Sequence, residues 1–411
     1  MVAYSRLKYA FAGLPDAERD AAKLQTLDAL KRLRAALRAD LPGRTTSTLM
    51  LGTWNIRNFD DNRFGHGTRL EDSLYYIAEV ISAFDVIAIQ EVCEDLTPFT
   101  RLMSVLGPEH DFLITDVTEG DSGNRERLGF IYNKSKVRFT GVAGEIVLPF
   151  DDQISDVTKA RQFARTPFAC TFQAGWFKFS FATVHIYYGA DGLSTAEYAR
   201  RVAEIDGVAK FIAKRAKADK AQSHVLVGDF NIEDFGAKTF DALAKHGFQV
   251  FRNKQGSNAK QNRFYDQISF IPKAGEVQLA QETEGKSNGV FNLFKYVFRD
   301  EDFTAYRDDI RRIVTGRRDA AKLDHTVALT KLAAATSDAQ KAKAQKAVDA
   351  ALKSIANEEN LLSDDVALKT YYLDDWRTFQ MSDHFPLFVE LKVDFTETYL
   401  DGLREAVLAP E

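Results

Sequence analysis

A set of polar residues stands at the ends of short apolar runs along the chain. Its members are Asn55, Glu91, His185, Asp229, Asn231, Asp266, Asp383 and His384. Side chains at strand ends meet at one edge of a layered sheet, which is the usual place for a site built on a rigid scaffold. Taken singly, each residue is an ordinary turn residue, because Asp and Asn bond their own backbone in turns. The ordered set is what predicts a site.

The chemistry of this set suits a divalent metal and a phosphate. Glu91, Asp229 and Asp383 offer hard oxygen atoms, which suit a magnesium ion that neutralises a phosphate oxygen. His185 and His384 can donate to phosphate oxygens or move a proton, provided that a carboxylate orients each ring. The amides of the two asparagines can position ligands without adding charge. The sequence lacks the Cys/His pattern of a zinc site and any glycine-rich loop that would cradle a nucleotide phosphate.

Short apolar runs bounded by turn residues or charges predict buried strands. They are Leu49–Trp54, Val86–Gln90, Leu128–Tyr132, Phe179–Val184, Val225–Val227, Gln267–Ile271 and Phe385–Leu391. Helical patterns lie between some of them, at Leu70–Phe84, Thr195–Ala218 and Ala237–His246. Strands that alternate with helices indicate a layered α/β architecture. The strands on either side of Trp176 are linked too briefly for a helix, so we expect two mixed or antiparallel sheets with helices outside.

A leucine stripe near the N-terminus predicts a helix over Asp16–Asp40. Pro15 and Asp16 suit its start, and Pro42-Gly43 ends it. We expect this helix to dock on the main body; the alternative is that it binds a partner.

The segment from 285 to 375 differs from the rest and predicts a helical insertion. Arg317–Leu332 and Ser337–Ala356 predict two helices, and Ser337 with Gln340 resembles a capping box. The insertion lies between Asp266 and Ser382, so it can reach the rim of the site. Some of its residues could contact nucleic-acid phosphates: Tyr306, Arg307, Arg311, Arg312, Arg317 and Arg318. The aspartates interleaved with them favour a solvated helix face instead.

Composition allows a large folded domain and argues against nucleic-acid binding through bulk charge. The chain has 411 residues, is 45% hydrophobic and carries a formal net charge of -5, with a pI near 5.9. A local basic groove is still compatible with this balance. Cys93 and Cys170 are the only cysteines, so we expect buried, unpaired thiols and a reducing compartment, the cytoplasm. No run approaches the roughly 20 apolar residues of a membrane span, and no secretory signal is evident.

Several stretches, in order, resemble the endonuclease/exonuclease/phosphatase superfamily, which has the deoxyribonuclease I-like fold. They are Thr53-Trp54-Asn55-Ile56-Arg57, Ile89-Gln90-Glu91-Val92, Thr183-Val184-His185, Gly228-Asp229-Phe230-Asn231, Tyr265-Asp266-Gln267-Ile268 and Ser382-Asp383-His384-Phe385-Pro386-Leu387. Any one of them is weak, but the ordered series is specific. The resemblance implies a four-layered αββα sandwich and phosphoester cleavage that depends on Mg²⁺ or Mn²⁺.

The resemblance also implies a role for each residue. Glu91 would bind the metal, with Asn55 beside it and Asp383 at or next to the ion. Asp229 and Asn231 would align or activate the attacking water and contact the phosphate.

Two catalytic histidines are implied by the same resemblance. His384 would be oriented by Asp266, and His185 would be the second. In the deoxyribonuclease I branch, the carboxylate that orients this second histidine falls in a Glu-Arg pair, which Glu126-Arg127 matches. The branch also has an arginine that contacts phosphate in a Phe-x-Arg-x-Pro stretch, which Phe163–Pro167 matches through Arg165.

These two matches favour DNA as the substrate, since branches that act on abasic DNA commonly have a tyrosine in place of Arg165. The disulfide cysteines of secreted deoxyribonucleases are missing. We therefore expect a nuclease with a helical extension over 1–45, a catalytic domain over 46–395 that carries the insertion at about 285–375, and a tail over 396–411. Two alternatives stay open. One is a phosphatase or phosphodiesterase that acts on a small molecule or a lipid head group; the other is a binding module that has kept the fold without the activity.

Overall fold

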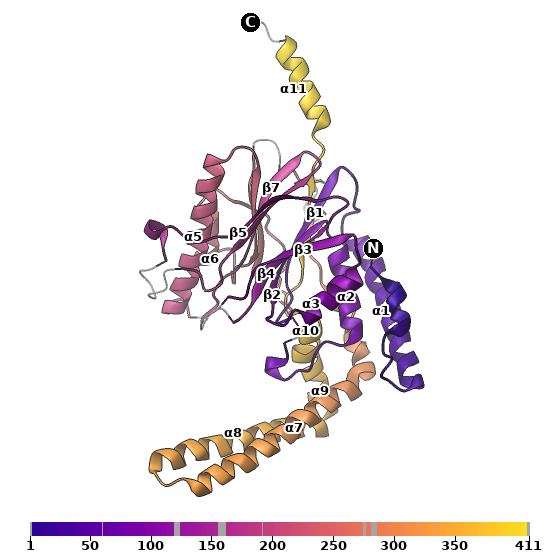
Figure 1. The fold of residues 1–411 in the computed structure, drawn as a ribbon, viewed down its shortest axis with the longest axis vertical. Helices are drawn as coiled ribbons and strands as arrows, with labels where there is room; N and C mark the ends of the chain where they lie inside the picture. Colours follow the sequence, from indigo (N-terminus) through magenta and orange to yellow (C-terminus); the bar gives the residue numbers. More distant parts are fainter. Residues whose placement is uncertain are drawn as a thin grey trace. The chain divides into compact units, whose positions relative to one another are not determined.

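The structure is a computed structural model that describes residues 2–59, 61–118, 124–154, 162–190, 192–273, 277–280 and 286–408 (Figure 1). The chain forms two compact units. The first contains Met1–Phe59, Glu71–Leu293 and Ser382–Glu411, and the second contains Asp60–Leu70 and Phe294–Met381. The second unit thus includes much of the segment predicted as an insertion, together with a short segment that the sequence placed in the main domain. Gly285, where the insertion was expected to begin, lies outside the described residues.

The first sheet of the first unit has six strands in the order β11-β12-β1-β2-β4-β3. Their bounds are Asn288–Val290 for β11, Leu387–Lys392 for β12, Thr48–Asn55 for β1, Val86–Val92 for β2, Arg127–Asn133 for β4 and His110–Ile114 for β3. Only β1 and β2 run parallel among these neighbours; the other pairs are antiparallel. A parallel pair needs a crossover, and α2 (Glu71–Ser82) provides it.

The second sheet also has six strands, in the order β5-β6-β7-β8-β10-β9. Their bounds are Arg138–Glu145 for β5, Phe168–Ala174 for β6, Phe177–His185 for β7, Ser223–Asp229 for β8, Asp266–Ile271 for β10 and Gln249–Val250 for β9. Here β7 and β8 are the parallel pair, joined through α5 (Ala196–Ala218), and the other neighbours are antiparallel. The expectation of mixed sheets is therefore confirmed.

The main core lies between the two sheets and is rich in phenylalanine. Phe177, Phe179 and Phe181 alternate along β7, so the two-residue period of a strand points all three rings into this core. The ring of Phe181 lies 4.9 Å from that of Phe130 on the first sheet. Contacts of this kind pack the two sheets against each other.

Helices cover the outer faces, so the predicted four-layered αββα sandwich is confirmed (Figure 1). On the second sheet, Ile205 and Val208 of α5 pack with residues of β7, β8 and α6 (Lys238–Ala244) in a second core. On the first sheet lie α2 and α3 (Thr97–Leu106).

The predicted helix over Asp16–Asp40 is confirmed as α1, with the same bounds. It packs on α2, and Arg34 forms an ion pair with Glu79 at 3.1 Å. Leu30 and Leu33 of its stripe are buried, whereas Leu24 is 63% exposed. The stripe therefore docks over its second half.

The second unit is built around a long helical hairpin, α7 (Phe303–Ala334) and α8 (Asp338–Ser363). The sequence placed the start of the first helix at Arg317, which is wrong, because α7 already begins at Phe303. The capping box at Ser337 and Gln340 is confirmed. After α8 come α9 (Asp365–Tyr371), a π-helix (Tyr372–Trp376) and α10 (Arg377–Gln380).

The proposed basic strip on α7 is paired with carboxylates. Arg307 and Arg311 contact Asp365, and Arg317 contacts Glu358, at 2.7, 3.2 and 2.6 Å. Arg312 and Arg318 pair with nearby aspartates. Tyr306 is buried with Phe298 and Trp376, so it offers no stacking surface. The sequence allowed either a basic strip for nucleic-acid phosphates or a solvated helix face. The structure favours the solvated helix face, because these arginines are paired with carboxylates.

The C-terminal segment forms a helix, α11 (Thr396–Leu408), whose residues are all at least partly exposed; residues 409–411 lie outside the described part. Cys93 and Cys170 are free and buried, as predicted. Within the described ranges, no helix is long and apolar enough to cross a membrane.

Candidate active site

The sandwich brings the ends of β1, β2, β7, β8 and β10 together. His185 at the end of β7 is paired in register with Asp229 at the end of β8, and Asp229 is paired with Asp266 at the start of β10. Asn55 ends β1, and Glu91 lies near the end of β2. Strand register alone therefore gathers much of the predicted set at one edge.

Asp229 lies at the centre of the site. Its Oδ1 accepts the backbone N–H of Asn231 at 2.9 Å, and its Oδ2 accepts the side-chain amide of Asn55 at 3.0 Å. The same Oδ2 lies 3.6 Å from Nε2 of His185 and 3.7 Å from Nε2 of His384. Burial alone would raise the pKa of Asp229, but the charges of the two histidines and these hydrogen bonds lower it. Asp229 is therefore an ionised carboxylate between two imidazoles.

His384 is oriented by Asp266. Its Nδ1 lies 2.7 Å from Oδ2 of Asp266, in a buried hydrogen bond. Burial opposes the charged ring, but Asp266 and Asp229 raise the pKa of His384 well above its ordinary value. These carboxylates favour the charged form of the ring, and its Nε2 lies 3.7 Å from Oδ2 of Asp229.

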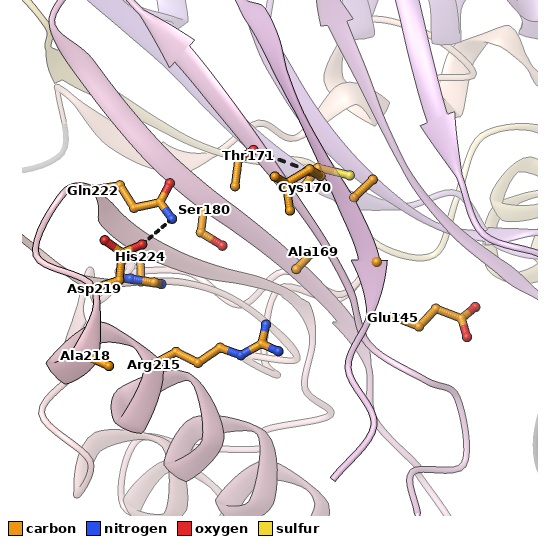
Figure 2. A pocket seen from close by; sticks show the side chains of 13 residues that line it. Glu145, Ala169, Cys170, Thr171, Ser180, Arg215, Ala218, Asp219, Gln222 and His224 are labelled. Atoms are coloured by element: carbon orange, nitrogen blue, oxygen red, sulfur yellow. Dashed lines mark hydrogen bonds between the residues drawn. The ribbon is translucent and has the colours of Figure 1, made fainter. Parts of the chain in front are cut away.

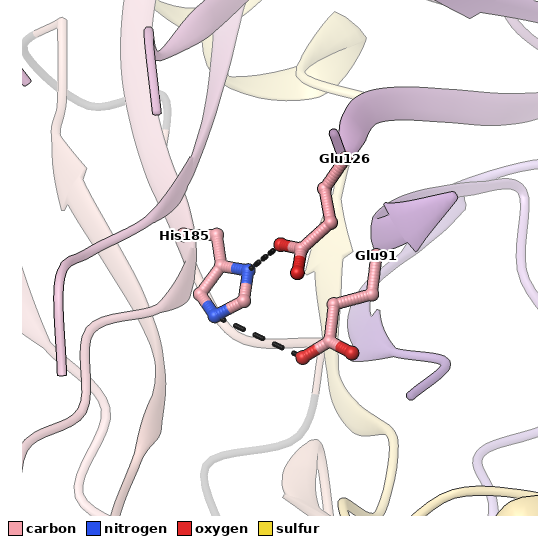
Figure 3. Close-up of side chains that lie close together, drawn as sticks. All are labelled: Glu91, Glu126 and His185. Carbon is pink, nitrogen blue, oxygen red and sulfur yellow. Dashed lines mark ion pairs between the residues drawn. The ribbon is translucent and has the colours of Figure 1, made fainter. Parts of the chain in front are cut away.

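The ring of His185 forms an ion pair with Glu126 (Figure 3). Glu126 in turn forms an ion pair with Arg165. Nδ1 of His185 lies 3.0 Å from Oε2 of Glu126, and Nε of Arg165 lies 2.7 Å from the same oxygen. Burial opposes the ionised form of Glu126, but His185 and Arg165 lower its pKa to about 2. The pKa of His185 is raised against burial and the charge of Arg165, because Glu126 and Asp229 are close. Arg165, Glu126 and His185 thus form a buried charged chain that leads to Asp229.

Glu91 sits at an irregularity in β2, where the register with β4 shifts between Ile89 and Val92. Its φ of 64° is in the left-handed region, which re-aims the side chain as bulges do. Oε1 accepts the amide N–H of Asn55 at 2.7 Å, and Oε2 accepts the backbone N–H of Asn58 at 2.6 Å. The Asn55 amide thereby bridges Glu91 and Asp229.

The donors around Glu91 fit a hard divalent cation. Burial raises the pKa of Glu91, and the charges of Glu126 and Asp383 raise it further. A cation would relieve this gathering of carboxylates, and carboxylate oxygens are the ligands that Mg²⁺ prefers. The carboxylate of Asp383 is 42% exposed and lies 3.6 Å from Nε of Arg57. Among the described residues, Glu91, Glu126 and His185 lie close enough to share one ion, and so do Asp229, Asp266 and His384; Asp383 belongs to neither group.

Two contacts at the strand ends hold this geometry; their residues, Ser382 and Trp54, belong to the predicted motifs, but the contacts were not predicted. Ser382 donates its hydroxyl to the backbone oxygen of Asn55 at 2.6 Å, and Trp54 donates its indole N–H to the backbone oxygen of His384 at 2.9 Å. They tie the loop that carries His384 to the end of β1.

Two buried charged residues on α5 were missed as well: Glu204, which pairs with Arg200, and Arg201, which pairs with Glu233. Glu204 accepts the backbone N–H groups of Ala164 at 3.1 Å and of Tyr187 at 3.2 Å. Arg201 donates to the backbone oxygen of Asn231 at 3.3 Å. A usable signal was present, because these charges lie on the same face of α5 as the buried Ile205 and Val208.

Gly228 allows β8 to approach β7 closely just before Asp229. Its φ is 128°, and a Cβ at this position would lie 2.1 Å from the backbone oxygen of Val184. Substitution by alanine should therefore destabilise the fold by more than about 3 kcal/mol, because backbone must move. Urea unfolding measures this change.

Gly247→Ala is the matched control for Gly228→Ala. Gly247 also has a positive φ, of 86°, but a Cβ there meets nothing within 4 Å. Gly247→Ala should therefore lower the free energy of unfolding only by the contribution of backbone strain, about 1–2 kcal/mol. Equal losses in the two variants would show that close approach to Val184 is not what requires glycine.

Comparison with known proteins identifies a matching family and several solved structures of low sequence identity. The model of the Endonuclease/Exonuclease/phosphatase family matches residues 52–328. A mannosyl-6-phosphatase of Bacteroides thetaiotaomicron VPI-5482 is 18% identical, with 59% of this chain and 90% of that chain covered and a TM-score of 0.44. The human Nocturnin catalytic domain is 13% identical, with 57% and 84% covered and a TM-score of 0.43. TDP2 of D. rerio, in complex with a single-strand DNA product, is 13% identical, with 60% and 91% covered and a TM-score of 0.41. No curated protein matches the chain.

Proposed function

Since this chain belongs to the endonuclease/exonuclease/phosphatase family and is a phosphoesterase, we propose that it is a metal-dependent nuclease that hydrolyses the phosphodiester bonds of DNA. The observation that carries the proposal is the buried chain formed by Arg165, Glu126 and His185, with distances of 2.7 and 3.0 Å between successive groups. Both Glu126 and Arg165 match the deoxyribonuclease I branch that the sequence resembles. A cytoplasmic location stays a prediction.

The proposed reaction is a single in-line attack by water on phosphorus. The new P–O bond forms as the P–O bond to the leaving sugar oxygen breaks, and that oxygen takes the electron pair and then a proton from solvent. Asp229, kept ionised between two imidazoles, orients the water and takes its proton. His185 and His384 donate from Nε2 to the phosphoryl oxygens, and Arg165 adds positive charge beside them. Asn231 contacts the phosphate from the loop after β8. Because these groups are buried and tied to strand ends, they need little reorganisation during the reaction.

Glu91 and Asp383, with Asn55 beside them, would hold Mg²⁺ or Mn²⁺. When bound, the ion supplies positive charge that neutralises a phosphoryl oxygen. The amide nitrogen of Asn55 faces Glu91 and Asp229, so this residue also holds the two carboxylates in place.

Plasmid nicking with Mg²⁺ or Mn²⁺ tests the proposal directly. Wild type should convert supercoiled plasmid to open circles, and His384→Ala should not. Because phosphate contacts dominate DNA affinity, the rate should fall steeply as salt rises. A wild-type enzyme that leaves plasmid intact while it releases phosphate from soluble esters would overturn the choice of DNA.

Hydrolysis of a small phosphoester, or of a lipid head group, is the second candidate. It is favoured by the net charge of -5 and by the pairing of Arg307, Arg311 and Arg317 with carboxylates. A panel of inositol phosphates, sphingomyelin and soluble esters separates it from the nuclease.

Glu204 should act as a positioning residue for this reaction, because its two oxygens hold the segments that carry Arg165 and His185. Glu204→Leu should lower kcat by roughly 10- to 100-fold, since small displacements of catalytic groups are costly. Glu204→Gln keeps one acceptor oxygen and should lose less. Steady-state kinetics with plasmid measures kcat and KM separately, and we expect the change mainly in kcat.

Glu197→Leu is the control on the same helix, because Glu197 is exposed. It should leave both kcat and KM unchanged. A folded Glu204→Leu enzyme with wild-type kcat would contradict the positioning role.

A further inference from the structure

A second polar groove lies at the opposite end of β7 and β8 from the catalytic residues (Figure 2). Its volume is about 470 Å³, which is within the usual range for small-molecule sites. The floor is formed by β6, β7 and β8, one wall by the end of α5 and the turn after it, and the other wall by β5. The groove is therefore separate from the site that contains Asp229.

The floor of the groove changes from apolar to polar between two successive rows of side chains on the same face of the sheet. Ala182 and Leu226 are paired neighbours beneath α5 and belong to the apolar core there. The next row on this face is Thr171, Ser180 and His224, which are directly opposite one another across β6, β7 and β8. A polar row on the covered face of a sheet is costly unless its groups find partners.

His224 lacks such a partner at one ring nitrogen. The residue is only 5% exposed, and its Nε2 makes no hydrogen bond within the described part of the chain. The ring bonds to the backbone of Asp219, while burial lowers the pKa of His224. A neutral ring that donates through one nitrogen leaves the other as an acceptor. Nε2 is thus free to accept an O–H or N–H from a bound molecule.

Arg215 is the cation among the residues that line the groove, beside the carboxylates of Glu145 and Asp219. Arg215 lines the wall, with its guanidinium 4.5 Å from the ring centre of Phe211, and forms no ion pair among the residues that the structure describes. Asp219 is already occupied, because it accepts from the backbone of Ala221 and the amide of Gln222 at 2.9 and 2.7 Å. The carboxylate of Glu145 points away from Arg215 in Figure 2.

We propose that this groove binds a small organic anion that carries a hydroxyl group. Its phosphate, phosphonate or carboxylate group pairs with the guanidinium of Arg215, and its hydroxyl donates to Nε2 of His224. The hydroxyl of Ser180, which lies between Thr171 and His224 in the same row, provides a further polar contact. The proposal does not depend on the reaction carried out at the other end of the strands.

A titration with 2-hydroxyethylphosphonate tests it, because the C–P bond of this probe resists phosphoesterases. The imidazole C–H signals of the protein are followed by NMR in the presence of EDTA, and His224→Gln identifies the signal of His224. This signal should shift and saturate in the wild type. The dissociation constant should rise at least about tenfold in Arg215→Gln, which removes a charge-assisted contact. It should stay unchanged in Lys217→Gln, which removes the same charge at a position of α5 that does not line the groove.

Ethylphosphonate, which lacks the hydroxyl, should bind more weakly. The signals of the other histidines report whether each variant is folded. A His224 signal that stays fixed while the signals of His185 or His384 move would overturn the site. Equal binding by wild type and Arg215→Gln would overturn the anion contact, and equal binding of the two phosphonates would overturn the contact with His224.

Discussion

Asp229→Asn should lower kcat for plasmid cleavage by about a thousandfold or more, the scale expected for the loss of a general base. The change hardly alters the shape of the side chain, but it removes a charge that lies 3.6 and 3.7 Å from the two catalytic imidazoles. This charge also helps to raise the pKa of both histidines. The residual activity should therefore decline at a lower pH than the wild-type activity, because the imidazoles lose their protons earlier. A pH–rate profile of the variant and the wild type measures both effects.

Asp234→Asn makes the same chemical change at an exposed position in the following loop. It should leave the rate and the profile unchanged. If Asp229→Asn cleaved plasmid at the wild-type rate, the proposed role of Asp229 and the in-line mechanism built on it would be wrong.

Removing divalent metal with EDTA should lower the rate by at least about a hundredfold, because a metal contributes several kcal/mol of charge stabilisation. Adding Mg²⁺ or Mn²⁺ back should restore it. Glu91→Gln should raise the metal concentration needed for half-maximal activity by about tenfold or more, since it removes a carboxylate charge and keeps the side-chain shape. Calorimetry with Mn²⁺ measures the same loss without relying on activity.

Glu94→Gln is the matched control for Glu91→Gln, because Glu94 is exposed and pairs with Arg125 at 3.1 Å. Its metal requirement should equal that of the wild type. Full activity in EDTA, or an unchanged metal requirement in Glu91→Gln, would rule out the metal site at Glu91.

Local patterns in the sequence predicted the helices and strands that bury an apolar face. They also predicted which polar residues at the strand ends form the site. The family model confirms the resemblance, and the helix over Asp16–Asp40 and the two mixed sheets are confirmed. Edge strand β5 was missed because it has no apolar alternation: it contains Gly141 and Gly144, and Val142 is 63% exposed. Strand patterns depend on burial, and an exposed edge leaves no such pattern.

For the site, the structure brings together the residues that the motifs selected, while their individual roles stay predictions. Features that depend on distant partners were not accessible from local sequence. One example is the pairing of Arg317 with Glu358 on α8, which involves one arginine of a run that looks basic when read along α7 alone. Glu204 likewise joins two segments that are far apart in the chain. The left-handed backbone of Glu91 follows from a register shift between β2 and β4, which no short motif reveals.

The left-handed positions around the site have a consequence for directed evolution. Glu91 and Asn231 have φ values of 64° and 53°, where β-branched side chains are strongly disfavoured and Asn, Asp and Gly are tolerated. A library randomised at Asn231 should thus return this narrow set whichever substrate is used for selection. Variants with an altered substrate range would have to carry their substitutions at positions with negative φ. The left-handed backbone at a few residues thus limits which positions of this protein can be varied.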